Sequence, residues 1–134
     1  MGGKVSCTLG EVKNRADFII YWGGNPAECH PRHFTRYTLT QKGKYVPNGR
    51  KGRTMVLVDI RETPSVKAAD IFLQVRPGKD FEVLSSLRAL VKGQTVDPML
   101  VAETGLSNVT CEAQRESVAL AELVGAVIDS HTSL

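Results

Sequence analysis

The sequence predicts an α/β fold in which helices flank a mostly parallel sheet, a Rossmann-like three-layer domain that is either complete or incomplete within this chain. Three short apolar runs indicate strands, at 18–22, 55–58 and 71–75, and segments with helical spacing lie between them. Uninterrupted apolar strands are typical of parallel sheets, because helices cover both faces of such a sheet. With 134 residues, the chain is expected to form a single α/β domain over 1–134.

The first half of the chain contains two predicted helices. Thr8 and Glu11 form a capping box, which predicts a short helix that runs to about Ala16. The strand at 18–22 is expected to be buried, and Gly23 ends it. Pro31 suits the first position of a second helix, which Gly43 can end. The shared face of this helix would hold Phe34, Tyr37 and Thr38.

The second half continues the alternation of strands and helices. The segment 41–53 carries glycines, a proline and basic residues, and it is interpreted as an exposed loop. A short helix is expected from Thr63-Pro64 through Ala69. Helical spacing predicts a longer helix over 80–92, closed by Gly93, with one apolar stripe. That stripe would contain Phe81, Leu84, Leu87 or Arg88, and Val91. Residues 94–134 are expected to be helical, with a short helix from Asp97-Pro98 and a final one from Thr110.

Charge is distributed unevenly along the chain, although the net charge is only +3. No Asp or Glu occurs from Cys29 to Val58, and seven of the 17 Lys and Arg residues lie there. This region is either a solvated basic face or an anion attractor. A basic RNA-binding domain is a distant alternative, and we expect no nucleic-acid partner because few aromatics and no recognition motif accompany the charge.

The chain carries no sign of a membrane or secretory protein. No run approaches the roughly 20 apolar residues that cross a bilayer, and the N-terminus lacks the apolar core of a signal peptide. The three cysteines, Cys7, Cys29 and Cys111, are scattered and suggest no disulfide framework. We therefore expect no membrane span and a cytoplasmic location.

Polar and glycine residues follow all three predicted strands. These are Gly23-Gly24-Asn25, Asp59-Ile60-Arg61 and Arg76-Pro77-Gly78-Lys79-Asp80. Ligands of parallel sheets bind beyond the carboxyl ends of the strands, where glycines let the backbone approach a phosphate and an acid can accept from ribose or a base. The pattern fits a nucleotide. The dinucleotide fingerprint G-x-G-x-x-G is missing, which disfavours an ordinary nicotinamide dehydrogenase.

Several residues near these strand ends have more than one interpretation. Glu28 is either a loop acid or a ligand contact, and His30 either caps the following helix or contacts phosphate. Asp59 has a ligand-binding or loop-fixing role, because an uncompensated acid at the end of a buried strand costs stability. Asp80 is either a helix-start acid or a ligand contact. Trp22 is interpreted as core.

Cys29 and His30 do not form a reactive pair in this interpretation. They are adjacent, so their side chains diverge, and Cys29 is expected to be a buried or half-buried thiol. The three histidines show no ligand spacing with the cysteines, so no metal site is predicted within the chain.

Four motifs resemble the B subunit of formylmethanofuran dehydrogenase, a member of the molybdopterin oxidoreductases. They are L-G-E-V-K-N-R-A-D at 9–17, Y-W-G-G-N-P-A-E with H-P-R-H at 21–33, V-D-I-R-E-T with Ala69-Asp70 at 58–70, and P-G-K-D at 77–80. The resemblance covers roughly 8–93 in one order and spacing, and it is thin from 94 onward. G-x-N-P-x-E-x-H-P, D-x-R-x-T and P-G-x-D are shared widely in the superfamily, whereas H-P-R-H and the opening motif indicate this particular subunit.

The resemblance implies an α/β domain that binds one of two pyranopterin (molybdopterin) guanosine dinucleotides. Carried over to this chain, Gly23, Gly24 and Asn25 would lie along the pyrophosphate and ribose. Asp59 and Arg61 would lie near the guanosine, and Gly78 with Asp80 near the guanine or its supporting loop. The family enzyme reduces carbon dioxide to formate at tungsten or molybdenum, in the one-carbon metabolism of methanogenesis. A further subunit of the enzyme condenses the formate with methanofuran, and electrons arrive through iron–sulfur clusters.

The chain also departs from this family. Its members are several times longer, and they carry an iron–sulfur segment and a cysteine or selenocysteine metal ligand upstream of the matched region. We therefore interpret the chain as a fragment or excised domain that holds half of one cofactor site, lacks iron–sulfur clusters and does not turn over alone. The catalytic residues stay unknown. The alternative is a non-catalytic nucleotide-binding or assembly module that has kept the fold.

Overall fold

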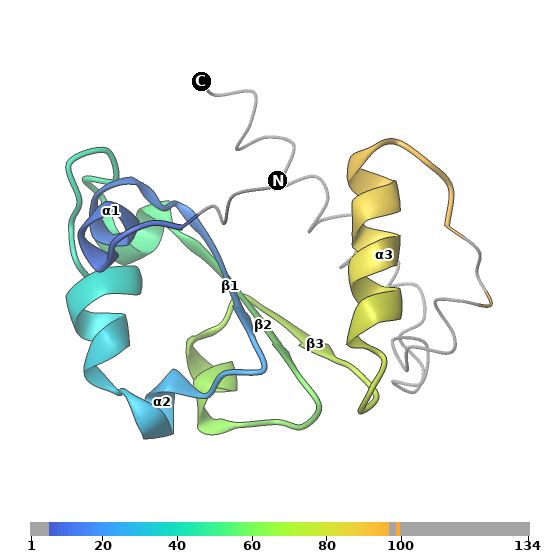
Figure 1. Cartoon of the computed structure of the whole chain (residues 1–134). Coiled ribbons are helices and arrows are strands. Elements are labelled where there is room, and N and C mark those ends of the chain that lie inside the picture. Colours follow the sequence, from blue (N-terminus) through green and yellow to red (C-terminus); the bar gives the residue numbers. More distant parts are fainter. Residues whose placement is uncertain (1–5, 97–98, 100–134) are drawn as a thin grey trace.

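The fold is built on a three-stranded parallel sheet. The computed structural model describes residues 6–96 and residue 99. The strands are β1 (Phe18–Trp22), β2 (Thr54–Asp59) and β3 (Ile71–Gln74), in the order β1-β2-β3 (Figure 1). In the register, Ile20 lies opposite Val56, and Val58 lies opposite Leu73. All three predicted strands and the α/β class are confirmed.

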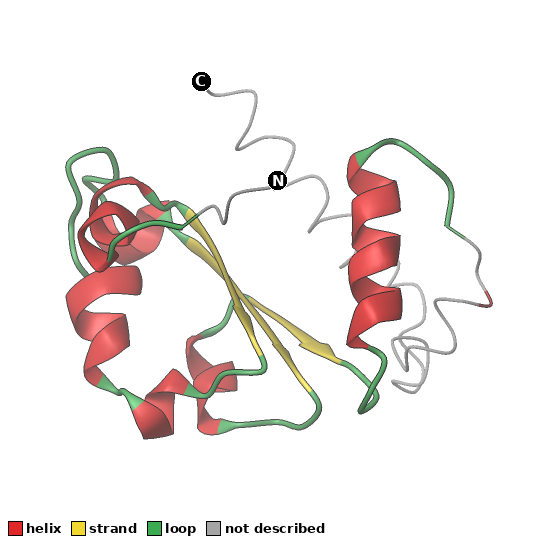
Figure 2. Ribbon diagram, viewed as in Figure 1, coloured by secondary structure: helices red, strands yellow, loops and turns green. Residues whose placement is uncertain are grey.

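Helices cover both faces of this sheet. On one face lie α1 (Leu9–Arg15), α2 (Pro26–Cys29), the π-helix η1 (Phe34–Thr38) and the 3₁₀ helix η3 (Pro64–Ala68). On the other face lies α3 (Asp80–Val91), and the short 3₁₀ helix η2 (Gly49–Gly52) precedes β2 (Figure 2). This open three-layer arrangement is consistent with an incomplete Rossmann-like domain.

The capping box at the start of α1 is present as predicted. The Thr8 hydroxyl accepts from the Glu11 N–H at 3.2 Å, and the Glu11 carboxylate accepts from the Thr8 N–H at 2.8 Å. These bonds satisfy two backbone donors that a helix start otherwise leaves open. The helix ends at Arg15, with Ala16 as its C-cap.

The central strand β2 supplies both halves of the core. Val56 and Val58 pack with Leu73 and Val83 on the α3 side. Met55 and Leu57 pack with residues of η1 and η3 on the opposite side. All four β2 side chains are at most 1% exposed, which explains why this strand is apolar without alternation.

Strand β1 is only half-buried, so the prediction of a buried strand was wrong in this respect. It is an edge strand of the described sheet, since only β2 pairs with it. Its residue Ile20 is 38% exposed. An apolar run alone does not distinguish an edge strand from a central one.

The predicted apolar stripe of α3 was right at Leu87 and wrong at Phe81, Leu84 and Val91, and the helix bounds were nearly right. Val83 is 1% exposed, and Leu87 and Leu90 pack on the sheet beside it. Phe81 is 79% exposed instead, and Leu84, which is 50% exposed, also points away from the core. Both stripes have helical spacing, so periodicity alone could not tell which one faces the sheet.

The second helix differs from its prediction. The unpredicted helix α2 begins at Pro26, and the following helical segment ends as the π-helix η1 at Thr38 rather than at Gly43. Its last turn closes through the Phe34 carbonyl, which accepts from the N–H of Leu39 and of Thr40. Gly43 has another role: a Cβ there would lie 2.1 Å from the Lys13 carbonyl oxygen, so glycine permits close packing against α1.

The segment 41–53 is less exposed than predicted, because Arg53 at its end is 4% exposed. The Arg53 guanidinium donates to the carbonyls of Tyr37 and Thr38 in η1, at 3.0 and 2.6 Å, and to the Lys13 carbonyl in α1. One buried side chain thereby joins two helices to the start of β2.

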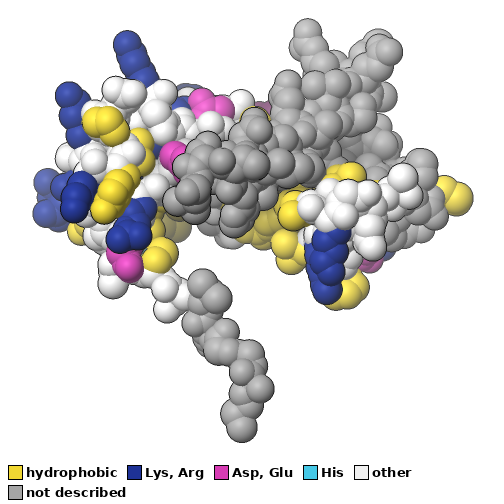
Figure 3. Space-filling view, turned by 90° about the horizontal axis from the view of Figure 1, so that it is seen from above, with side chains coloured by type: hydrophobic (Ala, Val, Ile, Leu, Met, Phe, Trp, Pro, Cys, Tyr) yellow, Lys and Arg dark blue, Asp and Glu magenta, His cyan; other side chains and the backbone are white. Residues whose placement is uncertain are grey.

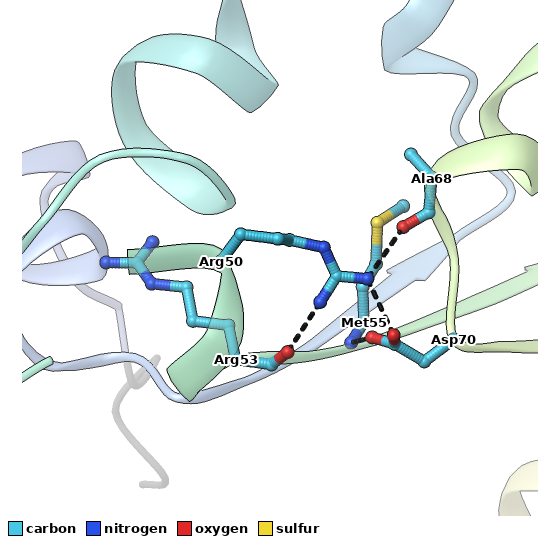
Figure 4. Close-up of polar contacts among 5 residues, drawn as sticks. All are labelled: Arg50, Arg53, Met55, Ala68 and Asp70. Carbon is cyan, nitrogen blue, oxygen red and sulfur yellow. Dashed lines mark hydrogen bonds and ion pairs between the residues drawn. The ribbon is translucent and has the colours of Figure 1, made fainter. Parts of the chain in front are cut away.

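A second arginine joins the starts of β2 and β3 (Figure 4). Arg50 donates to the Asp70 carboxylate at 2.6 Å and to the carbonyls of Arg53 and Ala68. The other Asp70 oxygen accepts from the buried N–H of Met55 at 2.7 Å. We call Arg50, Arg53 and Asp70, with the carbonyls and N–H groups that they bind, the amino-end network.

Some predictions fall outside the described residues. The short helix expected from Asp97 and the final helix expected from Thr110 belong to this group. Among the helices that the structure describes, none is both long enough and apolar enough to cross a membrane.

Candidate functional site

The carboxyl ends of the three parallel strands lie side by side, at the bottom of Figure 1. At the end of β1, the Gly23 N–H donates to the Val58 carbonyl at 2.8 Å, and the chain then turns away with Gly23 at φ +61°. Nothing lies within 4 Å of a Cβ built on Gly23 or Gly24. The turn therefore presents backbone to open space, as a phosphate-binding turn requires.

Asn25, which follows this turn, is held by a side-chain network. Its amide oxygen accepts from the Ser65 hydroxyl at 2.7 Å, and its amide nitrogen donates to the Glu28 carboxylate at 2.5 Å. The Ser65 hydroxyl also accepts from the Ala27 N–H at 3.1 Å, and Ser65 is fully buried. Ser65 of η3 thus fixes the turn after β1, and sequence reasoning missed it because a serine in a short helix carries no signal of its own.

The loop after β2 is fixed by its own polar groups. One oxygen of the half-buried Asp59 carboxylate accepts from the neighbouring Ile60 N–H at 2.7 Å. The Ile60 carbonyl accepts from the Gln74 side chain at 3.1 Å. Arg61 is exposed. The loop-fixing role predicted for Asp59 is therefore present, and its role toward a ligand stays a prediction.

Thr63, in the same loop, has a buried hydroxyl without a hydrogen-bond partner among the described residues. Unpaired buried polar groups are uncommon in native proteins and call for an explanation. The sequence contained this threonine within D-x-R-x-T, but nothing in the pattern indicated that its hydroxyl would be unsatisfied.

The turn after β3 contains Gly78, at φ +79°, and is followed by α3. Asp80, the first residue of α3, accepts from the indole N–H of Trp22 at 2.6 Å. Trp22 also packs against the core on this face, which confirms its interpretation as a core residue. Asp80 therefore links the end of β1 to the start of α3.

His30 and Cys29 lie apart from the glycine turn, at the end of α2. The His30 N–H donates to the Pro26 carbonyl, and its own carbonyl accepts from the His33 N–H at 2.8 Å. Both residues line a surface pocket between α1 and η1. The Cys29 thiol is exposed, so the prediction of a buried or half-buried thiol was wrong.

The basic region divides into structural and surface residues. Arg50 and Arg53 belong to the amino-end network, whereas Arg32, Arg36, Lys42, Lys44 and Lys51 are exposed. Figure 3 shows Lys and Arg side chains gathered on the side of the molecule where α1 and η1 lie.

No group of three or more His, Cys, Asp or Glu residues in the described part of the chain could hold a metal ion.

Comparison with known proteins relates this α/β segment to subunits of oxidoreductases. No protein-family model matches the chain. The alpha subunit of F420-dependent formate dehydrogenase 1 from Methanococcus maripaludis is 31% identical over 96 residues, which are 71% of this chain and 13% of that protein.

Two stronger matches are to the B subunit of tungsten-containing formylmethanofuran dehydrogenase 2. The protein from Methanocaldococcus jannaschii is 56% identical over 87 residues, which are 65% of this chain and 20% of that protein. The protein from Methanococcus maripaludis is 48% identical over 95 residues, 71% of this chain and 22% of that protein. The resemblance to the B subunit of formylmethanofuran dehydrogenase is thereby confirmed for this segment, and the chain spans about one fifth of the length of these relatives.

Proposed function

We propose that this chain contributes the guanosine-dinucleotide part of a tungsten or molybdenum pyranopterin site in a formylmethanofuran dehydrogenase. The observation that carries the proposal is that the carboxyl ends of the three strands lie side by side, with positive-φ glycines after β1 and β3 and with Asp59 as the last residue of β2. The similarity to the B subunit of tungsten-containing formylmethanofuran dehydrogenase supports a tungsten site in this class of enzyme.

Each predicted residue has a specific role in this proposal. The backbone at Gly23 and Gly24 approaches the pyrophosphate, and Asn25 holds the ribose side of the turn, with Glu28 and Ser65 keeping its amide in place. The second Asp59 oxygen and Arg61 face the guanosine. Gly78 allows the third turn to approach the guanine, and Asp80 supports that turn through Trp22. His30 acts at a distance, by ending α2.

The described residues fit such a ligand in two respects. The open space over Gly23, Gly24 and Gly78 leaves room for a phosphate-bearing group, since nothing lies within 4 Å of a Cβ at these positions. The Thr63 hydroxyl beside the Asp59 loop is buried and has no hydrogen-bond partner among the described residues. When bound, the metal pyranopterin supplies the redox chemistry, and this chain binds and orients its dinucleotide arm.

At the level of the whole enzyme, we propose carbon dioxide reduction to formate for formylmethanofuran synthesis, together with other formylmethanofuran dehydrogenase subunits that carry iron–sulfur clusters. The compartment would be the cytoplasm, because the scattered cysteines suggest no disulfide framework. We propose that the single α/β domain extends over 1–134 and is inactive alone. Elemental and cofactor analysis of the native complex that contains this chain tests the enzyme assignment.

Calorimetry with guanosine diphosphate tests the binding role directly. We expect measurable binding to the full chain, weakened about tenfold by Asp59→Asn, because a lost charge-assisted hydrogen bond costs about 1.5 kcal/mol or more. Asp17→Asn is the matched control, since Asp17 is an exposed acid just before β1, at the opposite end of the sheet. Equal affinity of the Asp59→Asn variant and the wild type would remove Asp59 from the site.

A further inference from the structure

A surface pocket of about 430 Å³ lies between α1, α2 and η1. This volume is within the usual range for small-ligand sites. Nine residues are predicted from the sequence to bind cofactor, and only His30 of these lines the pocket. The pocket is therefore distinct from the site at the carboxyl ends of the strands. Its lining residues are Leu9, Cys29, His30, Pro31, Arg32, His33, Arg36 and Tyr37.

The charge of this pocket favours an anion. Arg32 and Arg36 are among the lining residues, which include no Asp or Glu. The Arg36 guanidinium lies 6.0 Å from the centroid of the Tyr37 ring. A guanidinium binds carboxylate and phosphate groups through paired N–H donors, and ring stacking keeps it ordered. The pocket therefore offers positive charge beside apolar and aromatic surface.

Hydrogen bonding beneath the pocket favours one tautomer of His33. The Thr38 hydroxyl contacts the His33 carbonyl at 3.3 Å and accepts from the Tyr21 hydroxyl at 2.8 Å. Tyr21 has a single hydroxyl proton, which it donates to Thr38. Its oxygen can therefore accept from His33 Nδ1, 2.8 Å away. This assignment of the hydroxyl protons favours the tautomer with the His33 proton on Nδ1 and with Nε2 as an acceptor.

The same surroundings favour the neutral imidazole. Burial, followed by the nearby His30, lowers the pKa of His33 below its ordinary value of 6.5. Burial also raises the pKa of Tyr21, so its hydroxyl keeps its proton. In the described part of the chain, Nε2 has no hydrogen-bond partner, which leaves its lone pair for a ligand that donates a proton.

We propose that this pocket binds a small organic anion whose head group also carries an O–H, as a phosphate monoester does in its singly protonated form. The anionic oxygens bind Arg32 and Arg36, the O–H donates to His33 Nε2, and an apolar or aromatic body contacts Leu9 and Tyr37. This assignment does not depend on a nucleotide at the strand ends.

Phenyl phosphate is the probe for this proposal, because it combines the head group with an aromatic body. At pH 6, about half of a phosphate monoester carries the extra proton, since its second pKa is about 6. Nitrogen-15 NMR of the full chain should show Nδ1 of His33 protonated before any addition. Titration with phenyl phosphate should then shift His33 Nε2 and the Arg36 side chain, whereas benzoate, which lacks the O–H at this pH, should bind more weakly.

Three variants separate the parts of the pocket. Arg36→Gln should weaken phenyl phosphate binding about tenfold, which corresponds to a lost charge-assisted hydrogen bond. His33→Asn keeps a donor near Tyr21 but removes Nε2, so it should abolish the preference for phenyl phosphate over benzoate. Lys51→Gln, which removes a basic residue outside the pocket, is the control and should change neither affinity.

Several results would overturn the proposal. One is an NMR spectrum in which Nε2 of His33 is protonated and Nδ1 is not. Another is a titration with phenyl phosphate that leaves the signals of His33 and Arg36 unshifted. A third is equal affinity of the Arg36→Gln variant and the wild type for phenyl phosphate. Asp59→Asn should leave phenyl phosphate binding unchanged, so this proposal and the proposed function fail independently.

Discussion

The two ends of the sheet use their polar residues in opposite ways. At the amino end, Arg53, Arg50 and Asp70 bind backbone groups of α1, η1 and β2, and they have little left for a ligand. At the carboxyl end, Gly23 and Gly78 turn the backbone toward open space. Each end also leaves one buried polar atom unpartnered among the described residues, Arg53 Nε at the amino end and the Thr63 hydroxyl at the carboxyl end. We infer that the amino end stabilises the fold, whereas the carboxyl end is arranged for binding.

The largest effect on stability is expected from Arg53→Met. This change keeps most of the apolar volume but removes the donors from the carbonyls of Lys13, Tyr37 and Thr38. We expect the free energy of unfolding to fall by about 3 kcal/mol, because one buried and two partly buried acceptors become unsatisfied together. Urea denaturation of the full chain measures this change.

Lys51→Met is the matched control for Arg53→Met, since Lys51 is exposed and lies two residues earlier, in η2. It should change the free energy of unfolding by less than about 0.5 kcal/mol. If the two variants were equally stable, the amino-end network would not be what holds the helices on the sheet.

A smaller loss is expected from Asp70→Ala, which deprives Arg50 and the buried Met55 N–H of their acceptor. The ion pair is partly exposed, with 37% and 39% of the two side chains accessible, so its own contribution is small. The unsatisfied N–H raises the expected cost to about 2 kcal/mol. Glu62→Ala, which removes an exposed acid from the carboxyl end, should cost much less.

Asp70 also predicts how stability depends on pH. Burial alone would raise the pKa of its carboxyl, but hydrogen bonds from Arg50 and Met55 and the charge of Arg50 together lower it below 3.8. A lowered pKa in the folded state means that the stabilisation is complete above the ordinary pKa and is lost as the pH falls through the folded value. The stability difference between wild type and Asp70→Asn should therefore shrink below about pH 4. A difference that grows on acidification would contradict this assignment.

The smallest change in stability is expected at the carboxyl end, from Ser65→Ala. Two hydrogen bonds disappear, to Asn25 and from Ala27, for an expected cost of about 1 kcal/mol. Binding of guanosine diphosphate should weaken as well, because the Asn25 turn loses its support. Ser85→Ala, at a half-buried serine of α3, is the control. A Ser65 variant that is destabilised but binds normally would separate Ser65 from the site.

The strands and their ends could be predicted because their signals are local. An apolar run such as 55–58 is read directly from the sequence, and the Thr8 capping box is a four-residue pattern. The apolar stripe of α3 could not be chosen correctly, because Phe81 and Val83 both begin stripes with helical spacing. The choice between these stripes depends on the sheet, which the helix sequence does not contain.

Contacts between distant segments explain the other differences. Ser65 and Asn25 are 40 residues apart, and Arg53 and Lys13 are also 40 apart, so no local pattern connects them. The position of Arg53 did indicate a structural role, since a cation directly before a buried strand needs hydrogen-bond acceptors. The position of Asp70 directly before β3 indicated a similar need for hydrogen-bond donors.

The division between the two sheet ends is tested most directly by backbone amide NMR during titration of the full chain with guanosine diphosphate. We expect the largest shifts at Gly23, Gly24, Ile60 and Gly78, at the carboxyl ends of the strands. The amides of Met55 and Asp70, which donate within the amino end, should stay unchanged. Shifts concentrated at Met55 and Asp70, with none at the glycine turns, would contradict binding at the carboxyl end.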